Sequence, residues 1–175
     1  MRAEMAVFYH VDRTNEALSR GLVMGWMPIP DDLPVEERTM LAHWFPKGVT
    51  RFGLEIVRKQ SPRLAIELEL EAQRRERYRV LPSRYASIFA FQSAADIHRY
   101  RHQMCLPIYT GRRGRIWKVE GRLMFRADMN LEKQHCGNLK TAAARYWAGE
   151  ASDDPLIEYL LEPPVTVLEE VPDEE

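Results

Sequence analysis

Three side chains that can take part in chemistry lie in three separate apolar stretches of the sequence. His10 lies in FYHVD, Phe89 lies in SIFAF, and Glu158 lies near the start of LIEYLLEPPVTVLEEV. An imidazole exchanges a proton near neutral pH, an aromatic ring stacks on a flat ligand, and a carboxylate stabilises a developing positive charge. Taken alone, each residue has an ordinary explanation as a core or solvent-facing side chain. Their order along the chain therefore carries the argument.

The elements that hold these residues are predicted to be strands. The first strand covers residues 5–12, and SIFAF at residues 87–91 runs directly into a helix that Ser93 caps. Near the C-terminus, IEYLLE and VTVLEEV are predicted to be a pair of strands that Pro163-Pro164 joins. Each candidate residue is thus expected to lie on a different strand of a sheet.

The remaining elements are predicted to be helices, strands and one long connection. The clearest helix covers residues 61–79, with acidic residues early and basic residues late. NLKTAAARYWAG is a second helix, with Asn138 as cap and Gly149 closing it, and residues 22–50 are expected to be irregular. Further elements are expected as a short helix at 15–20 and strands around a glycine-containing turn at 107–128. Strands and helices are mixed without βαβ alternation, which favours an α+β fold.

Length and composition set the class of protein. The chain has 175 residues and a net charge of −1, which favours one soluble domain and gives no overall field that attracts nucleic acid. We expect a single domain over residues 1–171 and an acidic tail over 172–175. Apolar runs are too short for a membrane helix, and no signal-peptide pattern opens the sequence. We expect a protein made in the cytoplasm, with delivery into a host or target cell without a cleaved signal left open.

The three stretches together resemble the motifs of the ADP-ribosyltransferase superfamily, in the branch of diphtheria-toxin-like toxins and poly(ADP-ribose) polymerases. FYHVD with LSRGL is similar to the first motif, and SIFAFQSAADIHRY to the second. EYLLEPPVTV is similar to the third motif, a strand led by Glu158. The resemblance implies two packed antiparallel sheets with surrounding helices and a central cleft for NAD.

The resemblance also assigns roles within that cleft. Glu158 is the expected catalytic carboxylate, which stabilises the cationic ribose as nicotinamide leaves. His10 is expected to bind the ribose, and Phe89 to stack on the nicotinamide ring. The expected NAD-binding residues are His10, Val11, Arg84, Ser87, Phe89 and Phe91.

Some of these assignments depart from the family pattern or do not come from it. Val11 stands where the family often has glycine, and phenylalanine replaces the usual tyrosine. The stacking ring is Phe89, or Phe91 if the register is shifted by two, because both positions face the same side of a strand. Arg84 is assigned to the pyrophosphate from its charge and position alone.

The expected function is therefore transfer of ADP-ribose from NAD to a macromolecule, as in bacterial effectors and toxins. A protein side chain is the expected acceptor, with host ubiquitin as one candidate, and nucleic acid is an alternative. A second alternative is a catalytically silent module of the same fold, which binds a partner through the aromatic segment at 22–53.

The sequence also contains residues that could form a metal site. His98 and His102 are spaced i, i+4 on a helix, with Cys105 just beyond and His135-Cys136 further along. The zincin glutamate is missing and arginines surround the two histidines, so a solvated basic helix face is the preferred interpretation. No metal is expected.

Overall fold

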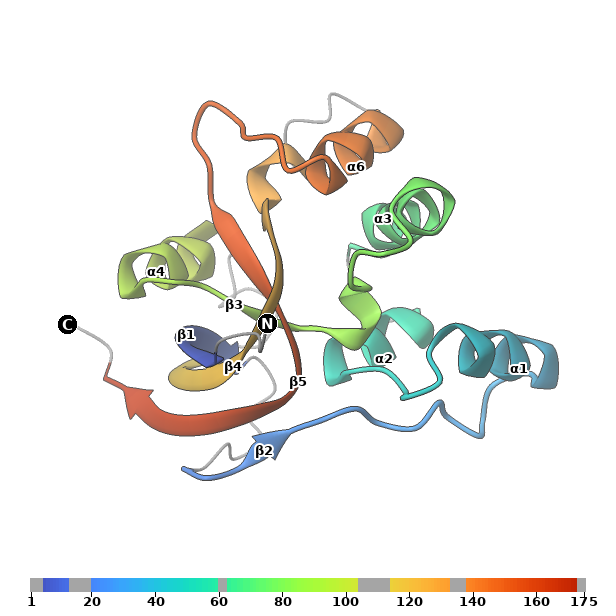
Figure 1. Ribbon diagram of the computed structural model, residues 1–175, viewed down its shortest axis with the longest axis horizontal. Coiled ribbons are helices and arrows are strands. Elements are labelled where there is room, and N and C mark those ends of the chain that lie inside the picture. The colour runs from blue at the N-terminus through green and yellow to red at the C-terminus, as the bar shows by residue number, and fades with distance from the viewer. Residues whose placement is uncertain (1–4, 13–19, 60–62, 104–113, 133–137, 173–175) are drawn as a thin grey trace.

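The computed structural model describes residues 5–12, 20–59, 63–103, 114–132 and 138–172. These residues form an α+β fold around one five-stranded antiparallel sheet (Figure 1). Hydrogen bonding orders four strands as β1-β4-β5-β2, and β3 pairs with β5 as well. The strands are β1 (Met5–Asp12), β2 (Val23–Met24), β3 (Ile88–Ala90), β4 (Arg115–Asp128) and β5 (Ile157–Val171).

Helices surround this sheet. The α-helices are α1 (Val35–Trp44), α2 (Arg51–Val57), α3 (Leu64–Arg77), α4 (Ala94–Gln103) and α6 (Leu139–Trp147), with 3-10 turns η1 (Arg84–Ala86) and η2 (Met129–Glu132). Figure 1 shows α3 beside α6, α1 beside α2, and α4 near β1 on the other side of the sheet. The predicted α+β class is confirmed. The described strands belong to one sheet, where two had been expected.

The long strands β4 and β5 curve through the centre of the molecule (Figure 1). The first half of β5 pairs with β3 and with the end of β4, and its second half pairs with β2 and with the start of β4. Register shifts interrupt the β4–β5 pairing at three places, and such bulges bend a strand. A Cβ on Gly121 would lie 3.0 Å from Val165 Cγ2 and 3.2 Å from Leu161 Cδ1, so this glycine permits close packing inside the bend.

The prediction that Pro163-Pro164 separates two strands is wrong, because β5 is continuous from Ile157 to Val171. In the pairing with β4, Glu162 lies opposite Arg122 and Thr166 lies opposite Glu120. The three residues between them therefore face Gly121 alone. Prolines are tolerated in a strand at such a bulge, where their missing N–H groups interrupt no ladder bond. On the other side of the bulge, β4 runs through Gly121 as one continuous strand from Arg115 to Asp128.

The helices largely follow their capping signals. Asn138 Oδ1 accepts from Thr141 N at 3.0 Å, and Gly149 has a φ of 72° just after α6, as predicted. Ser93 Oγ accepts from Asp96 N at 3.1 Å at the start of α4. The helix predicted at 61–79 is α3, which begins at Leu64, while the expected cap at 61 lies outside the described residues.

Helix α1 was not predicted, since residues 22–50 were expected to be irregular. Of its ten residues only Leu41 is buried, so α1 lacks the apolar stripe from which helices are recognised. It is attached through Leu41, which packs in a core cluster with Ile56 of α2, and through Trp44, whose ring centre lies 3.3 Å from the Arg75 guanidinium carbon on α3.

Some predictions fall on residues that the structure does not describe. These are the helix expected at 15–20 for all but its last residue, the chain at 104–113, and the last three residues of the acidic tail. None of the described helices is long and apolar enough to cross a membrane.

Candidate functional site

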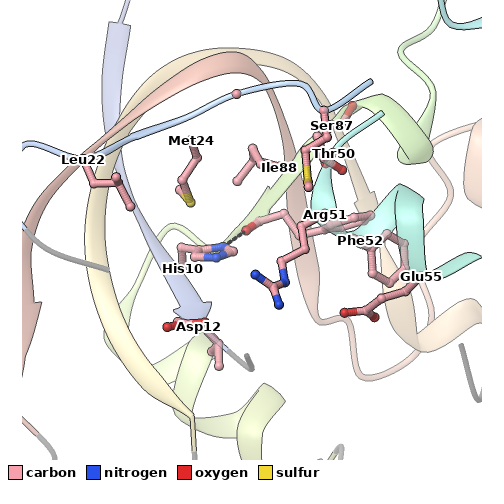
Figure 2. Close-up of a pocket in the computed structure, with 14 residues that line it drawn as sticks. His10, Asp12, Leu22, Met24, Thr50, Arg51, Phe52, Glu55, Ser87 and Ile88 are labelled. Carbon is pink, nitrogen blue, oxygen red and sulfur yellow. Dashed lines mark hydrogen bonds between the residues drawn. The ribbon is translucent and has the colours of Figure 1, made fainter. Parts of the chain in front are cut away.

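A half-open pocket of about 240 Å³ lies between β1, α2 and β3 (Figure 2). Four of the predicted NAD-binding residues line it, namely His10, Val11, Ser87 and Phe89. Leu22, Met24, Met27, Ile88 and Phe52 supply apolar surface, while Asp12, Arg51 and Glu55 supply charge. An apolar pocket with a few polar groups is the usual form of a small-molecule site.

His10 and Phe89 meet at this pocket although 79 positions separate them. The Nδ1 atom of His10 donates to the backbone oxygen of Phe89 at 2.7 Å, as Figure 2 shows. A carbonyl oxygen only accepts, so Nδ1 carries the proton in this hydrogen bond. The hydrogen bond fixes the ring between β1 and β3.

Phe89 lies at the boundary between the pocket and the interior. Its ring meets that of Phe52 edge-on, with centroids 4.6 Å apart and an interplanar angle of 71°. The guanidinium carbon of Arg84 lies 4.5 Å from the centre of the same ring. Arg84 therefore covers one face of Phe89, and that face is closed to a stacking ligand.

The alternative stacking residue, Phe91, is not at this pocket. Phe91 is 3% exposed and packs with Ile97 and with Tyr100, whose ring centroid lies 4.9 Å away. Its backbone pairs with Tyr9, which closes the sheet between β3 and β1. Phe91 is therefore a core residue that does not line this pocket, and its assignment to NAD binding stays a prediction.

The segment at 22–53 forms one wall of the pocket. Met27 and Val49 pair across it, with backbone hydrogen bonds of 2.7 and 3.0 Å. Gly48 beside them has a φ of 96°, and a Cβ there would lie 2.2 Å from Met27 O, so only glycine fits. Of its aromatic side chains, Phe52 faces the pocket and Phe45 is buried.

Thr50 holds α2 against β3 and so positions the charged end of the pocket. Its hydroxyl lies 3.2 Å from Tyr85 O and 3.1 Å from Ser87 O, and it accepts from Gly53 N at 3.4 Å as the helix cap. Ser87 in turn donates through Oγ to Ser83 O at 2.8 Å. Arg51 and Glu55 follow on α2 and reach the pocket from this anchor (Figure 2).

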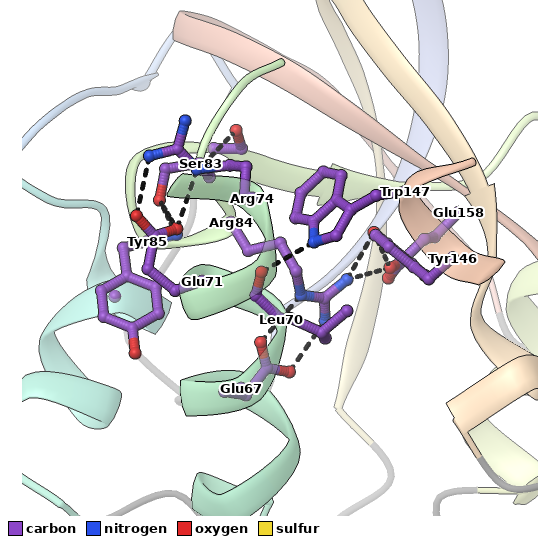
Figure 3. Close-up of polar contacts among 12 residues, drawn as sticks. Glu67, Leu70, Glu71, Arg74, Ser83, Arg84, Tyr85, Tyr146, Trp147 and Glu158 are labelled. Carbon is purple, nitrogen blue, oxygen red and sulfur yellow. Dashed lines mark hydrogen bonds and ion pairs between the residues drawn. The ribbon is translucent and has the colours of Figure 1, made fainter. Parts of the chain in front are cut away.

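Glu158 lies in a separate, buried network (Figure 3). Its side chain is 4% exposed, and Oε1 accepts from Tyr146 Oη at 2.6 Å and from Arg84 Nη1. Glu158 is not among the residues that line the pocket. The interpretation of this carboxylate as a solvated charge is excluded, and its catalytic role stays a prediction.

Arg84 is the centre of this network. Its Nε and Nη2 atoms donate to the two oxygens of Glu67, each at 2.8 Å, while Nη1 also donates to Tyr146 Oη at 2.7 Å. The Arg84 side chain is 3% exposed. The sequence assigned Arg84 to the pyrophosphate of NAD; the guanidinium is enclosed, bonded to two carboxylates and not among the pocket-lining residues, and the assignment stays a prediction.

The charges in this network stabilise the ionised arginine. Burial opposes a charge on Arg84, yet Glu158 and then Glu67 together raise the pKa of its guanidinium well above the ordinary value. Burial also raises the pKa of the Tyr146 hydroxyl, against the opposing effect of Arg84, so Tyr146 is a neutral donor. The network therefore contains two carboxylates and one guanidinium within the interior.

Sequence reasoning did not find Asp12, Thr50, Arg51 or Glu55 as pocket residues. Asp12 is the last residue of the predicted strand at 5–12, two positions after His10 and so on the same face, and this alternation could have identified it. Thr50 is the last residue of the segment expected to be irregular, Arg51 and Glu55 follow just after it, and no local pattern connects the three to β1 or β3. Their position depends on the contacts of Thr50 with residues 35 and 37 positions later.

The described residues contain no group of three potential metal ligands. His98 and His102 do lie on α4, His98 partly buried and His102 exposed. The other possible ligands of the alternative zinc site, at 105 and 135–136, lie outside the described residues.

The fold and the site define a small α+β protein with an apolar pocket that His10 and Phe89 line. The chain belongs to the family described as "Protein of unknown function (DUF2441)", whose model matches residues 37–173. The match includes β3, α2 and β5 but begins after β1, so His10 lies outside it. No curated protein matches the chain.

Proposed function

We propose that the chain is an NAD-dependent ADP-ribosyltransferase that moves ADP-ribose to a protein side chain and releases nicotinamide. The observation that carries the proposal is the meeting of His10 and Phe89 at one pocket through a hydrogen bond of 2.7 Å. The resemblance had selected these two residues from distant parts of the sequence. Their common pocket supports the interpretation of both stretches as parts of one site.

The pocket size fits one half of the cofactor. Small-molecule sites usually measure about 300–1,000 Å³, and this pocket at about 240 Å³ lies just below that range. Nicotinamide and its ribose would occupy it, with Phe89 on the ring and His10 on the sugar. The rest of NAD would extend along the open side, between the halves of the sheet that the bend in β4 and β5 creates.

In this proposal, Glu158 must change its hydrogen-bond partner before it can act on the ribose. It precedes Leu160 by two residues on β5, and Leu160 pairs with Phe89, so the carboxylate lies on the Phe89 side of the sheet. To stabilise the cationic ribose, Glu158 must exchange its bond with Arg84 for one with the sugar. Arg84 keeps its two bonds to Glu67 when this happens.

The second candidate is a partner-binding module of the same fold without catalysis. The observation that favours it is the pairing of Glu158 with Arg84 and Tyr146, outside the pocket lining. In this case the pocket binds a ligand, or the wall at 22–53 binds a protein, and NAD is not cleaved. The two candidates differ in one measurable product, free nicotinamide.

The test is incubation of the protein with NAD labelled in its adenylate half, first alone and then with a cell lysate or with ubiquitin. Nicotinamide release with label on a protein supports the transferase. Label on nucleic acid selects the alternative acceptor, and absence of both release and label selects the binding module. His10→Ala and Phe89→Leu should lower NAD affinity several-fold by calorimetry, because each removes a direct contact. His43→Ala on the exposed side of α1 is the matched control and should bind like the unaltered protein.

A further inference from the structure

Glu55 is a carboxylate that lines the pocket without a partner. It is partly buried on α2, and within the described part of the chain it makes no hydrogen bond or ion pair. Arg51 lies one turn earlier on the same helix, a spacing at which opposite charges often pair, yet these two do not. A partly buried carboxylate that its own chain leaves unpaired is available to a ligand.

The pocket that Glu55 lines is aromatic and has more carboxylates than guanidinium groups among its lining residues. Phe52 and Phe89 both face it, and aromatic rings attract cations through their faces. Two carboxylates, Asp12 and Glu55, oppose one guanidinium, Arg51, among the lining residues.

We infer that this pocket selects a positively charged aromatic heterocycle over its neutral counterpart, and that Glu55 supplies the selectivity. The inference rests on the proposed function only in naming the ligand. In NAD the nicotinamide ring is an N-ribosylated pyridinium cation, whereas free nicotinamide is neutral. Glu55 therefore favours the bound substrate and not the product.

The difference in charge between the ring in NAD and free nicotinamide affects how readily the product leaves. When the glycosidic C–N bond breaks, its electron pair passes to the ring nitrogen, and the ring loses its charge. The ribose carbon becomes cationic and is taken by the acceptor nucleophile, which gives up a proton. The neutral ring then no longer attracts Glu55, so its release is favoured. Glu158 cannot supply this selectivity from its observed position, since it is paired with Arg84 away from the pocket lining.

The experiment compares two probes that differ mainly in charge. Calorimetry measures the affinity of 1-methylnicotinamide, a cation, and of nicotinamide, which is neutral. The unaltered protein should bind the cation roughly two- to fivefold more tightly, the scale of a partly exposed charge pair. Added salt should reduce the preference, because it screens such pairs.

Variants identify the responsible residue. Glu55→Gln keeps the shape of the side chain and should bring the ratio of the two affinities close to one. Glu36→Gln is the matched control, because Glu36 is exposed on α1 and lines no part of this pocket, and the ratio should stay unchanged. Equal affinities in the unaltered protein, undetectable binding of both probes at millimolar concentration, or a preference that survives Glu55→Gln would each overturn the inference.

Nicotinamide release from NAD, measured on the same samples, separates this inference from the proposed function. Release without a preference for the cation refutes the role of Glu55 and leaves the transferase proposal standing. A preference for the cation without release refutes the transferase and leaves the pocket assignment standing.

Discussion

Arg84 and Glu158, which lie 74 positions apart, form an ion pair that is almost completely removed from solvent. Glu67 binds the same guanidinium through two N–H groups, and Glu158 shares a third donor nitrogen with Tyr146. The pair links η1 to β5 and thereby helps to hold β3, which follows η1, beside β5. Its energetic role follows from the imbalance of two carboxylates around one cation.

We expect Arg84→Met to destabilise the protein by about 3–5 kcal/mol, because it leaves Glu67 and Glu158 buried without a counter-charge. For a domain of this size, that loss lowers the melting temperature by roughly 6–20 °C. Thermal unfolding followed by circular dichroism measures the change. The triple variant with Glu67→Leu and Glu158→Leu removes the stranded charges and should recover much of the loss. A single Arg84→Met variant that melts like the unaltered protein would contradict this account of the network.

Gly53 is expected to tolerate no side chain. A Cβ there would lie 2.0 Å from Tyr85 O, which is backbone and cannot move away without shifting η1. Gly53→Ala should therefore cost about 1–3 kcal/mol, the usual cost of overpacking, and should disturb the pocket wall. Gly25→Ala is the control, since nothing lies within 4 Å of the Cβ position at Gly25. Urea denaturation of both variants measures the difference, and equal midpoints would show that α2 adapts.

These two predictions also show what the sequence made visible and what it did not. The strand at 5–12 was found to the residue, because its apolar run is a local signal. The caps Ser93 and Asn138 were found for the same reason. The Arg84–Glu158 pair and the contact of Gly53 with Tyr85 join distant parts of the chain, and no local pattern marks them.

The continuity of β5 was missed for a related reason. A Pro-Pro dipeptide indicates a turn when only its neighbours are considered. Here the proline pair is accommodated because Gly121 on another strand lies opposite it in a bulge. The pocket was also missed in part because it depends on contacts between residues that are far apart in the sequence. His10 and Phe89 were selected as chemical candidates, but Arg51 and Glu55 beside them are placed by the docking of α2 through Thr50.

Asp128 is expected to make stability depend on acid pH. Burial would raise the pKa of its carboxyl group, but hydrogen bonds from Ser152, Leu156 and Asn130 lower it below the ordinary value. A pKa that is lower in the folded than in the unfolded protein means that the folded structure stabilises the ionised carboxylate. This contribution is complete above the unfolded pKa of about 4 and is lost as the pH falls through the folded value. Urea midpoints between pH 6 and pH 3 should fall less steeply in Asp128→Asn than in the unaltered protein.

The exposed neighbour Asp153 provides the control for this measurement. Asp153→Asn should keep the steep decline, since its side chain is solvated. Parallel curves for the unaltered protein and for Asp128→Asn would assign the acid sensitivity to other carboxylates.

The last prediction concerns Glu158 itself. If its carboxylate stabilises the cationic ribose, Glu158→Gln should lower nicotinamide release by roughly two to three powers of ten, the scale for removing one preorganised electrostatic partner. NAD affinity should change far less, since the charge matters most in the transition state. The fold should survive, because glutamine can still accept from Arg84 and Tyr146, and the loss of one carboxylate leaves Glu67 and Arg84 as a balanced pair. Glu162→Gln, on the same strand, is the control, since Glu162 pairs only with the exposed side chains of Arg122 and Lys47 in the described structure and should be nearly silent. Release that survives Glu158→Gln but is lost in Glu162→Gln would show that the wrong carboxylate was chosen. Release that survives both changes would leave Glu158 with a structural role as the partner of Arg84.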